Sequence, residues 1–154
     1  MKIALIKENK IPIDRRVPLT PEQCKAIKKQ YKEVEIVVQT SDIRCFTDED
    51  YRKAGFEIVE DVSDCDVLFG VKEVPIKNLL QDKTYFFFSH TSKEQPYNRN
   101  LLQSILDNGN TLVDYESLTN EKGTRVIAFG RYAGLVGAYN GILTYGKRKG
   151  LFDL

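Results

Sequence analysis

Two nearly continuous runs of apolar residues lie in the middle of the chain, at residues 66–71 and 84–88, and polar loops bound both. Apolar runs of this length are typical of strands that are buried on both faces of a parallel sheet. Shorter or weaker runs predict further strands at residues 2–6, 34–39, 56–59 and 111–114. Residues 125–129 are predicted to form a further strand or an extended entry to the segment that follows.

Helix signals separate these strands. Thr20, Pro21 and Gln23 supply an N-cap, a proline at the first helical position and a capping-box glutamine. Thr47 followed by three acidic residues predicts a second helix start, and apolar residues at helical spacing predict a helix over residues 98–107. Strands that alternate with helices predict an α/β fold, in which a mostly parallel sheet carries helices on both faces, as in flavodoxin-like proteins.

Small residues recur at helical spacing near the C-terminus. They are Gly130, Ala133, Gly134, Gly137, Ala138 and Gly141. A glycine inside a helix costs roughly 1 kcal/mol relative to alanine, so a contact outside the helix must offset this. That contact is either a close helix packing inside the domain or a junction with a second domain or subunit. The spacing does not fit a dinucleotide-binding fingerprint.

Composition narrows the classes of function. A net charge of +1 gives no electrostatic reason to expect a nucleic acid or an anionic membrane as a partner. No apolar segment is long enough to span a membrane, and the N-terminal apolar run is too short for a secretory signal. The three cysteines form no C-x-x-C pair, so we expect reduced thiols in a cytoplasmic protein.

Titratable side chains follow the predicted strands. Lys72 and His90, the single histidine, come at the ends of the two apolar runs. Arg15, Arg16 and an acidic pair around Tyr115 follow other strands. Each of them alone has an ordinary structural explanation. Together, at the carboxyl edge of a parallel sheet, they predict a crevice for proton transfer on a small anionic amino or keto acid.

Four motifs resemble one family. They are VKEVP at 71–75, FFSHTSKEQ at 87–95, RVIAFGRYAG at 125–134 and RVPLTP at 16–21. Together they are similar to the N-terminal domain of saccharopine dehydrogenase, L-lysine-forming, which is also the lysine–ketoglutarate reductase activity. Alanine dehydrogenase and the transhydrogenase α subunit share the fold but match the histidine motif less well.

The resemblance implies catalytic roles for individual residues. Lys72 would take the proton from the secondary amine of saccharopine. His90 would be the acid–base group for water addition to the imine and for its collapse to lysine and 2-oxoglutarate. Glu73 and Glu116 would set the pKa values of that pair.

The resemblance also implies a substrate pocket. Arg16, Lys93 and Arg125 would hold the carboxylates of the substrate, and Phe129 would line the pocket. Spacing to the threonine and proline that start the first helix favours Arg16 over Arg15, and the choice between them stays open.

The family carries a dinucleotide-binding domain after the glycine-rich helix. We therefore predict a substrate-binding catalytic domain over residues 1–129 and an interdomain helix and tail over residues 130–154. NAD or NADP would bind mainly to a following domain, no metal is expected, and this chain would be inactive alone. The expected partners are the substrate and that domain, with homo-oligomerisation left open. The alternatives are an alanine dehydrogenase-like domain and a non-catalytic module that binds an amino acid or dicarboxylate.

Overall fold

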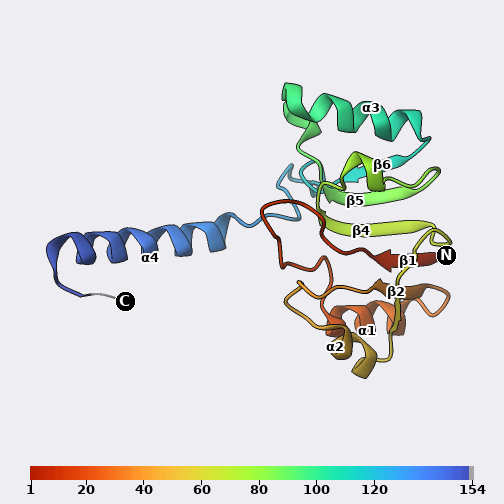
Figure 1. Cartoon of the computed structure of the whole chain (residues 1–154), viewed down its shortest axis with the longest axis horizontal. Helices are drawn as coiled ribbons and strands as arrows, with labels where there is room; N and C mark the ends of the chain where they lie inside the picture. Colours follow the sequence, from red (N-terminus) through yellow and green to blue (C-terminus); the bar gives the residue numbers. More distant parts are fainter. Residues whose placement is uncertain (153–154) are drawn as a thin grey trace. The chain divides into compact units, whose positions relative to one another are not determined.

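Within residues 1–152, six strands form one sheet in the order β3-β2-β1-β4-β5-β6. Figure 1 shows β2, β1, β4, β5 and β6 side by side in this order. All five strand pairings are parallel. The strands are β1 (Lys2–Leu5), β2 (Glu35–Gln39), β3 (Glu57–Val59), β4 (Val67–Lys72), β5 (Thr84–Phe88) and β6 (Thr111–Asp114). The predicted α/β fold around a parallel sheet is confirmed.

The computed structural model describes residues 1–152. Its contacts divide the chain into two compact units, Met1–Leu118 and Thr119–Leu154, and each is described by itself. Asp153 and Leu154, the end of the predicted tail, lie outside the described residues. Within residues 1–152, no helix combines the length and apolar character that a membrane crossing requires.

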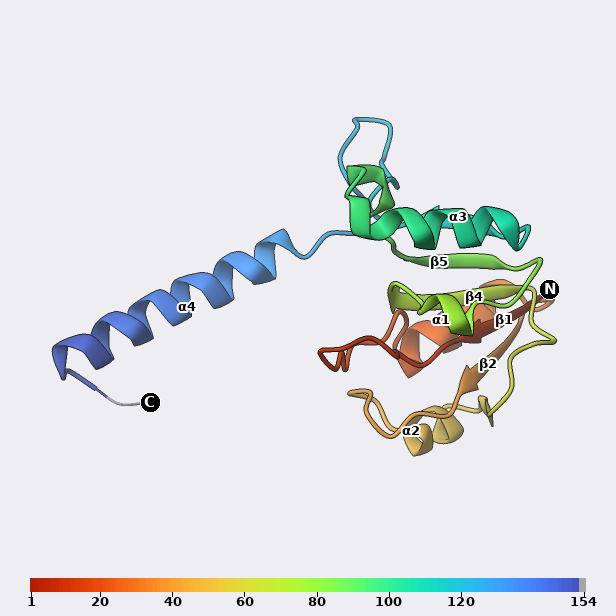
Figure 2. The ribbon, with the colours of Figure 1, turned by 45° about the horizontal axis from the view of Figure 1, so that its top comes forward.

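Three α-helices belong to the first unit. They are α1 (Pro21–Gln30), α2 (Asp48–Lys53) and α3 (Arg99–Asp107), and short 3-10 turns precede α3 at Thr91–Lys93 and Pro96–Asn98. The Thr20 side chain accepts a hydrogen bond from the Gln23 backbone, and Thr47 caps α2 in the same way, so both predicted helix starts are confirmed. In both views α3 lies beside the β5–β6 edge of the sheet (Figures 1 and 2).

The alternation of side chains along the strands divides the core between the two faces of the sheet. Ala4, Val37 and Leu68 pack with Leu101 and Ile105 of α3 on one face. The other face is covered by α1 and α2, with the contacting residues Ile3, Leu5, Cys24, Ile36, Val38 and Tyr51. The predicted helices on both faces of the sheet are therefore confirmed. The carboxyl edge of the sheet is formed by the loops that follow the strands.

The centre of the sheet is a topological switch point. From β1 the chain builds β2 and β3 on one side, and it returns with β4 on the other side of β1. Loops that leave β1 and β4 in opposite directions open a crevice between the carboxyl ends of these two strands, where ligands of open α/β sheets bind.

The described residues of the second unit, 119–152, form a loop, one long helix, α4 (Gly130–Lys149), and the turn that ends it. Gly150, with φ of +65°, ends the helix in the left-handed conformation, and Leu151 N–H bonds the Gly146 carbonyl at 3.0 Å. Apart from the nearby backbone of α4 itself, no heavy atom of the described residues lies within 4 Å of a Cβ built at Gly134, Gly137 or Gly141. What packs against the glycine face therefore stays a prediction.

The strand predicted over residues 125–129 is not formed. The described backbone there makes one isolated antiparallel bridge, between Thr119 and Arg125, and then bends into α4. A strand needs a neighbouring ladder for its N–H and C=O groups, and the second unit offers none. Val126 and Phe129, whose apolar character suggested the strand, are 58% and 44% exposed.

Candidate functional site

One polar cluster joins the loops that follow β5 and β6. His90 Nδ1 lies 3.1 Å from Glu116 Oε2, and Lys93 Nζ lies 2.9 Å from Glu116 Oε1. Burial raises the pKa of Glu116, but hydrogen bonds from Lys93 and His90 outweigh it and hold this pKa below its ordinary value. An ionised carboxylate only accepts hydrogen bonds, so Nδ1 carries a proton and Nε2 is left for a ligand.

Asp114, the last residue of β6, accepts hydrogen bonds from both loops of this cluster. Its Oδ1 accepts the Glu116 backbone N–H at 2.9 Å, and its Oδ2 accepts the hydroxyl proton of Ser89, which is fully buried. The Ser89 backbone N–H also points to Asp114 Oδ1, at 3.4 Å. One carboxylate thus fixes both loops that carry the histidine and its glutamate.

The backbone of His90 adopts the left-handed conformation, with φ of +57°. This conformation is uncommon for a non-glycine residue and needs support from its surroundings. Asn98, itself buried, supplies it by donating its Nδ2–H to the His90 carbonyl at 3.2 Å. The turn directs the chain from β5 into the 3-10 segment that holds Lys93.

A second cluster surrounds the end of β4, where Lys72 is the last strand residue. The carboxylate of Glu8, in the loop after β1, accepts two backbone N–H groups: that of Val71 at 2.7 Å and that of Lys72 at 2.9 Å. Burial raises the pKa of Glu8, and these two hydrogen bonds oppose the rise without cancelling it. Lys72 pairs in register with Phe88, two residues before His90, so the two clusters follow adjacent strands.

Glu73 forms an ion pair with Lys10. Burial lowers the pKa of Lys10, and the nearby positive charge of Lys72 lowers it further. The second oxygen of Glu73, Oε2, is buried without a hydrogen-bond partner among the described residues. The sequence predicted that Glu73 acts on Lys72 and His90; the structure gives its carboxylate a direct contact with Lys10.

Arg15 and Arg16 point to different neighbours. Arg16 makes a two-pronged pair with Asp14, in which Nε lies 2.9 Å from Oδ1 and Nη2 lies 2.5 Å from Oδ2. The hydrogen bonds from Arg16 lower the pKa of Asp14. Arg15 instead donates from Nε to the Ile43 carbonyl at 3.1 Å, and its own carbonyl accepts the Cys45 N–H at 2.7 Å. Arg15 therefore anchors its loop to the loop after β2.

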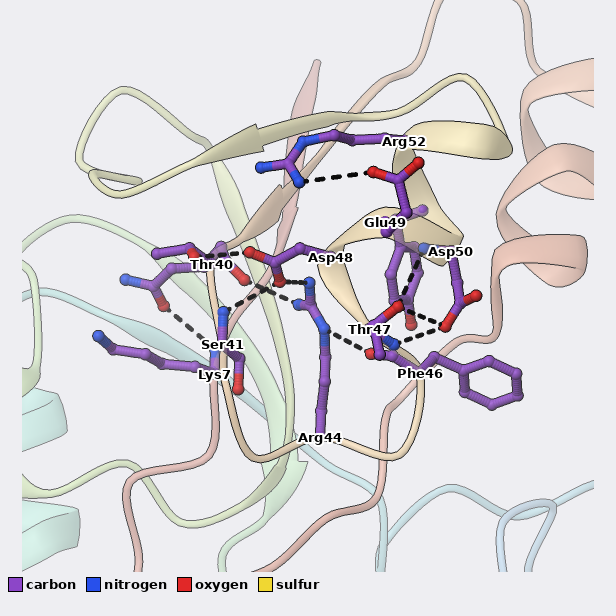
Figure 3. A network of polar contacts seen from close by, with 12 residues as sticks. Lys7, Thr40, Ser41, Arg44, Phe46, Thr47, Asp48, Glu49, Asp50 and Arg52 are labelled. Atoms are coloured by element: carbon purple, nitrogen blue, oxygen red, sulfur yellow. Dashed lines mark hydrogen bonds and ion pairs between the residues drawn. The ribbon is translucent and has the colours of Figure 1, made fainter.

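A buried arginine holds that second loop in place (Figure 3). Arg44 donates to the carbonyls of Gln39 and Phe46, each at 2.8 Å, pairs with Asp48, and stacks 4.7 Å above the ring of Tyr51. Asp48 in turn accepts from the Thr40 hydroxyl at 2.7 Å and from the Ser41 N–H at 3.1 Å. The network rigidifies the loop on which Arg15 rests.

A cleft of about 360 Å³ opens at the switch point. Glu8 and Asn9 line it from the β1 loop, and Lys72 and Glu73 line it from the β4 loop. Ile6, Leu68 and Tyr85 form part of its apolar wall. His90 is not among its lining residues, so the structure assigns Lys72 and Glu73 to this cleft and His90, Lys93 and Glu116 to the neighbouring cluster.

The two remaining predicted site residues, Arg125 and Phe129, belong to the second unit. Their roles stay predictions. The described residues also contain no group of three or more histidine, cysteine, aspartate or glutamate side chains arranged to hold a metal.

Sequence reasoning missed Glu8, Lys10 and Asp14 as members of the site. The signal that could have found them is the one that selected Lys72, because all three lie in the loop that directly follows β1. The partners of Glu8 and Lys10 are far away along the chain: Glu8 and Val71, and Lys10 and Glu73, are each 63 residues apart. Such pairings become visible only when β1 and β4 are known to be neighbours.

Comparison with solved structures defines the class of fold. A transhydrogenase from Sinorhizobium meliloti superimposes with a TM-score of 0.64 at 19% identity, over 78% of this chain and 36% of that chain. An L-alanine dehydrogenase gives a TM-score of 0.67 at 23% identity, over 80% and 35%. The chain therefore shares the α/β fold of these two proteins.

The family follows from the sequence match. The family model for the alanine dehydrogenase/PNT N-terminal domain matches residues 4–136, and the chain belongs to this family. Mouse mitochondrial alpha-aminoadipic semialdehyde synthase is 40% identical over 139 residues. The saccharopine dehydrogenase [NAD(+), L-lysine-forming] of Emericella nidulans is 37% identical over 144 residues. The resemblance read from the motifs is confirmed.

These relatives are longer than this chain. The match covers 90% of the chain but 15% of the mouse protein, and 89% of the chain but 37% of the fungal enzyme. The shared part is thus one domain of a larger protein in each relative.

Proposed function

We propose that this chain is the N-terminal substrate domain of an NAD(P)-dependent saccharopine dehydrogenase. The overall reaction is saccharopine + NAD(P)⁺ + water to lysine + 2-oxoglutarate + NAD(P)H + H⁺. The described residues carry no dinucleotide-binding fingerprint, so we derive here only the proton transfers. In this proposal the chain alone does not complete the reaction, because the hydride acceptor binds mainly to a further domain.

The first proton transfer is assigned to Lys72. As an amine it accepts the proton of the substrate's secondary amine, which must be lost before or as the imine forms. Its place at the carboxyl end of β4, beside the switch-point cleft, supports this role. Glu73 and Lys10 provide a charged pair next to it.

The second proton transfer is assigned to His90. Its Nε2 takes a proton from the water that attacks the imine carbon, and it returns a proton to the amine that leaves as lysine. Glu116, bonded to Nδ1, fixes the tautomer and stabilises the imidazolium that forms. Lys93 and Arg16, and Arg125 from the second unit, are proposed to hold the substrate carboxylates, with Phe129 lining the pocket.

One observation carries the proposal: His90 and Lys93, which both contact Glu116, follow strand β5, and β5 pairs with the strand that ends in Lys72. An acid–base group with a carboxylate on its far nitrogen, beside an amine, is what amine oxidation followed by imine hydrolysis requires. The identity to the saccharopine dehydrogenase of E. nidulans over 144 residues supports this substrate rather than alanine.

The proposal is tested by NMR titration of the single histidine. Saccharopine is expected to shift the His90 imidazole resonances of the wild-type chain, whereas alanine leaves them in place. Lys72→Ala should abolish the response, while Lys25→Ala, which removes an exposed lysine of α1, should keep it. No response to saccharopine in the wild type would count against a substrate site formed by this chain.

Turnover separates the alternative functions. The gene product is assayed for oxidation of NADH or NADPH with lysine plus 2-oxoglutarate, and separately with pyruvate plus ammonia. Activity with the first pair supports saccharopine chemistry, and activity with the second supports an alanine dehydrogenase. Binding of saccharopine with no turnover under either condition is the outcome expected of a non-catalytic binding module or of a substrate domain acting without its partner domain.

A further inference from the structure

Glu8 is a buried carboxylate to which neither the motifs nor the proposed mechanism gives a role. It is 8% exposed, and each of its two oxygens accepts one backbone N–H from the end of β4. Charged side chains are rarely buried to this extent unless an ion pair or hydrogen bonds compensate for the loss of water.

The position of Glu8 follows from where the β1–β4 ladder ends. The last backbone hydrogen bond between these segments runs from Ile6 N–H to the Phe69 carbonyl, at 2.9 Å. Beyond it the chain leaves β1, so the next N–H groups of β4 have no strand carbonyl opposite them. The Glu8 carboxylate takes the place of those carbonyls. One of the N–H groups that it accepts belongs to Lys72, the proposed base.

Gly70 provides the space for this contact. A Cβ at this position would lie 3.2 Å from Ile6 Cδ1 and 3.5 Å from Glu8 Oε1. A Cβ there would crowd the Ile6 side chain and would lie in ordinary van der Waals contact with the Glu8 carboxylate. Gly70 and Glu8, 62 residues apart in the chain, are thus direct neighbours in the fold.

We propose that Glu8 is a positioning residue: it fixes the backbone of Lys72, and with it the amine, against the loop that carries Arg16. The inference deepens the proposed function and rests on it for the role of Lys72. The contact between Glu8 and the Lys72 backbone exists without any ligand. Because the same residue joins the β1 loop to β4, it sets the spacing between a carboxylate bound at Arg16 and the base.

Glu8→Gln is the direct test. Glutamine has one acceptor oxygen, and its amide N–H₂ would face the second backbone N–H, so one of the two hydrogen bonds is lost and replaced by a donor–donor contact. Asp66→Asn is the matched control. Asp66 Oδ2 accepts the Lys2 backbone N–H at 2.8 Å, which joins β1 and β4 in the same way at the opposite end of the strands.

The first readout needs no ligand. The chain is labelled with trace acetic anhydride, and the acetylation of Lys72 is measured by mass spectrometry relative to that of the exposed Lys25. Glu8→Gln should raise this ratio at least threefold because the end of β4 is released. Asp66→Asn should change it less than 1.5-fold. An unchanged ratio in Glu8→Gln, or an equal change in the control, overturns the proposal.

The second readout uses saccharopine. If the wild-type chain binds it, Glu8→Gln should raise Kd about tenfold, whereas Asp66→Asn should leave Kd within twofold. Equal Kd values in the wild type and in Glu8→Gln also overturn the proposal. If the wild-type chain does not bind saccharopine, the proposed function fails for this chain, and the labelling ratio still decides whether Glu8 positions Lys72.

Discussion

Three carboxylates at strand ends share one physical role. Glu8 accepts the buried N–H of Val71, Asp114 accepts that of Ser89, and Asp66 accepts the exposed N–H of Lys2, each from a neighbouring strand or its loop. A buried N–H with no acceptor costs about 1–3 kcal/mol, so Glu8 and Asp114 stabilise the carboxyl edge of the sheet as well as shaping it. At the carboxyl edge, this role places Lys72 and the pair of His90 and Glu116.

Asp114→Ala should therefore lower the free energy of unfolding by about 2–3 kcal/mol, because the Ser89 hydroxyl and the Glu116 N–H lose their acceptor. Urea unfolding followed by circular dichroism measures this loss. Asp107→Ala, at an exposed end of α3, should stay within about 0.5 kcal/mol of the wild type. Equal losses in the two variants would contradict the role given to Asp114.

A pH dependence is expected from Asp48. Burial alone would raise its pKa, but the hydrogen bonds from Thr40 and Ser41 and the charge of Arg44 outweigh burial and lower it. A depressed pKa stabilises the fold above the pKa of the unfolded chain, about 3.9 for aspartate, and this stabilisation is lost as the pH falls through the folded value. Asp48→Asn should thus be less stable than wild type at pH 6, and the difference should shrink below about pH 4. Urea unfolding at pH 6, 4 and 3 measures it, and a constant difference would refute the assignment.

Residue-level prediction worked where a side chain follows a strand in sequence. Lys72 and His90 were found by that rule, and the structure places both at the carboxyl edge. It failed for Glu8 and for the contact between Lys10 and Glu73, because each joins segments 63 residues apart. No local pattern encodes which strand ends meet.

At the scale of the element, α4 shows how far composition predicts a helix. The spacing of small residues indicated a helix, and one forms over Gly130–Lys149. The run at 125–129 suggested a strand, which does not form because a strand depends on a neighbour and a helix satisfies its own hydrogen bonds. The boundary between the two is therefore set by hydrogen bonding and not by hydrophobicity.

Gly134→Ala and Gly137→Ala should each stabilise α4 by up to about 1 kcal/mol in this chain, because among residues 1–152 only the backbone of α4 itself lies close to the added methyl group and alanine is the better helix former. Gly150→Ala should instead destabilise the helix end by about 1 kcal/mol, since its φ of +65° is unfavourable for alanine. Amide hydrogen exchange along α4 measures both effects. If Gly134→Ala and Gly137→Ala destabilise α4 instead, the glycine face of this helix must pack closely against another part of the protein.

For the whole molecule, the sequence predicted the layers of the fold but not the order of its strands. Periodicity gives strands, helices and their buried faces, and all of these follow from local chemistry. That β1 lies between β2 and β4 is a property of the chain's path, which local patterns do not contain. The candidate site depends on the strand order. The sequence could therefore indicate individual residues of the site, but not which of them are neighbours in space.

The first unit holds all six strands and both faces of the core, so a fragment of residues 1–118 should fold. It should unfold in one cooperative transition and keep the amide and imidazole resonances of His90. A fragment of residues 1–110, which lacks β6 and with it Asp114 and Glu116, should lose them. Thermal unfolding and NMR spectra of the two fragments provide the test, and a disordered 1–118 fragment would disprove it.

The path of the chain also fixes when the candidate site can exist. A polypeptide leaves the ribosome from its N-terminus, and Glu116 emerges more than 100 residues after Glu8. Substrate can therefore recognise only the finished sheet and cannot guide the pairing of the earlier strands. Binding would add stability to the completed fold alone, about 2.7 kcal/mol at a ligand concentration one hundred times Kd. In the cell, the lifetime of this domain would then rise and fall with the supply of its substrate.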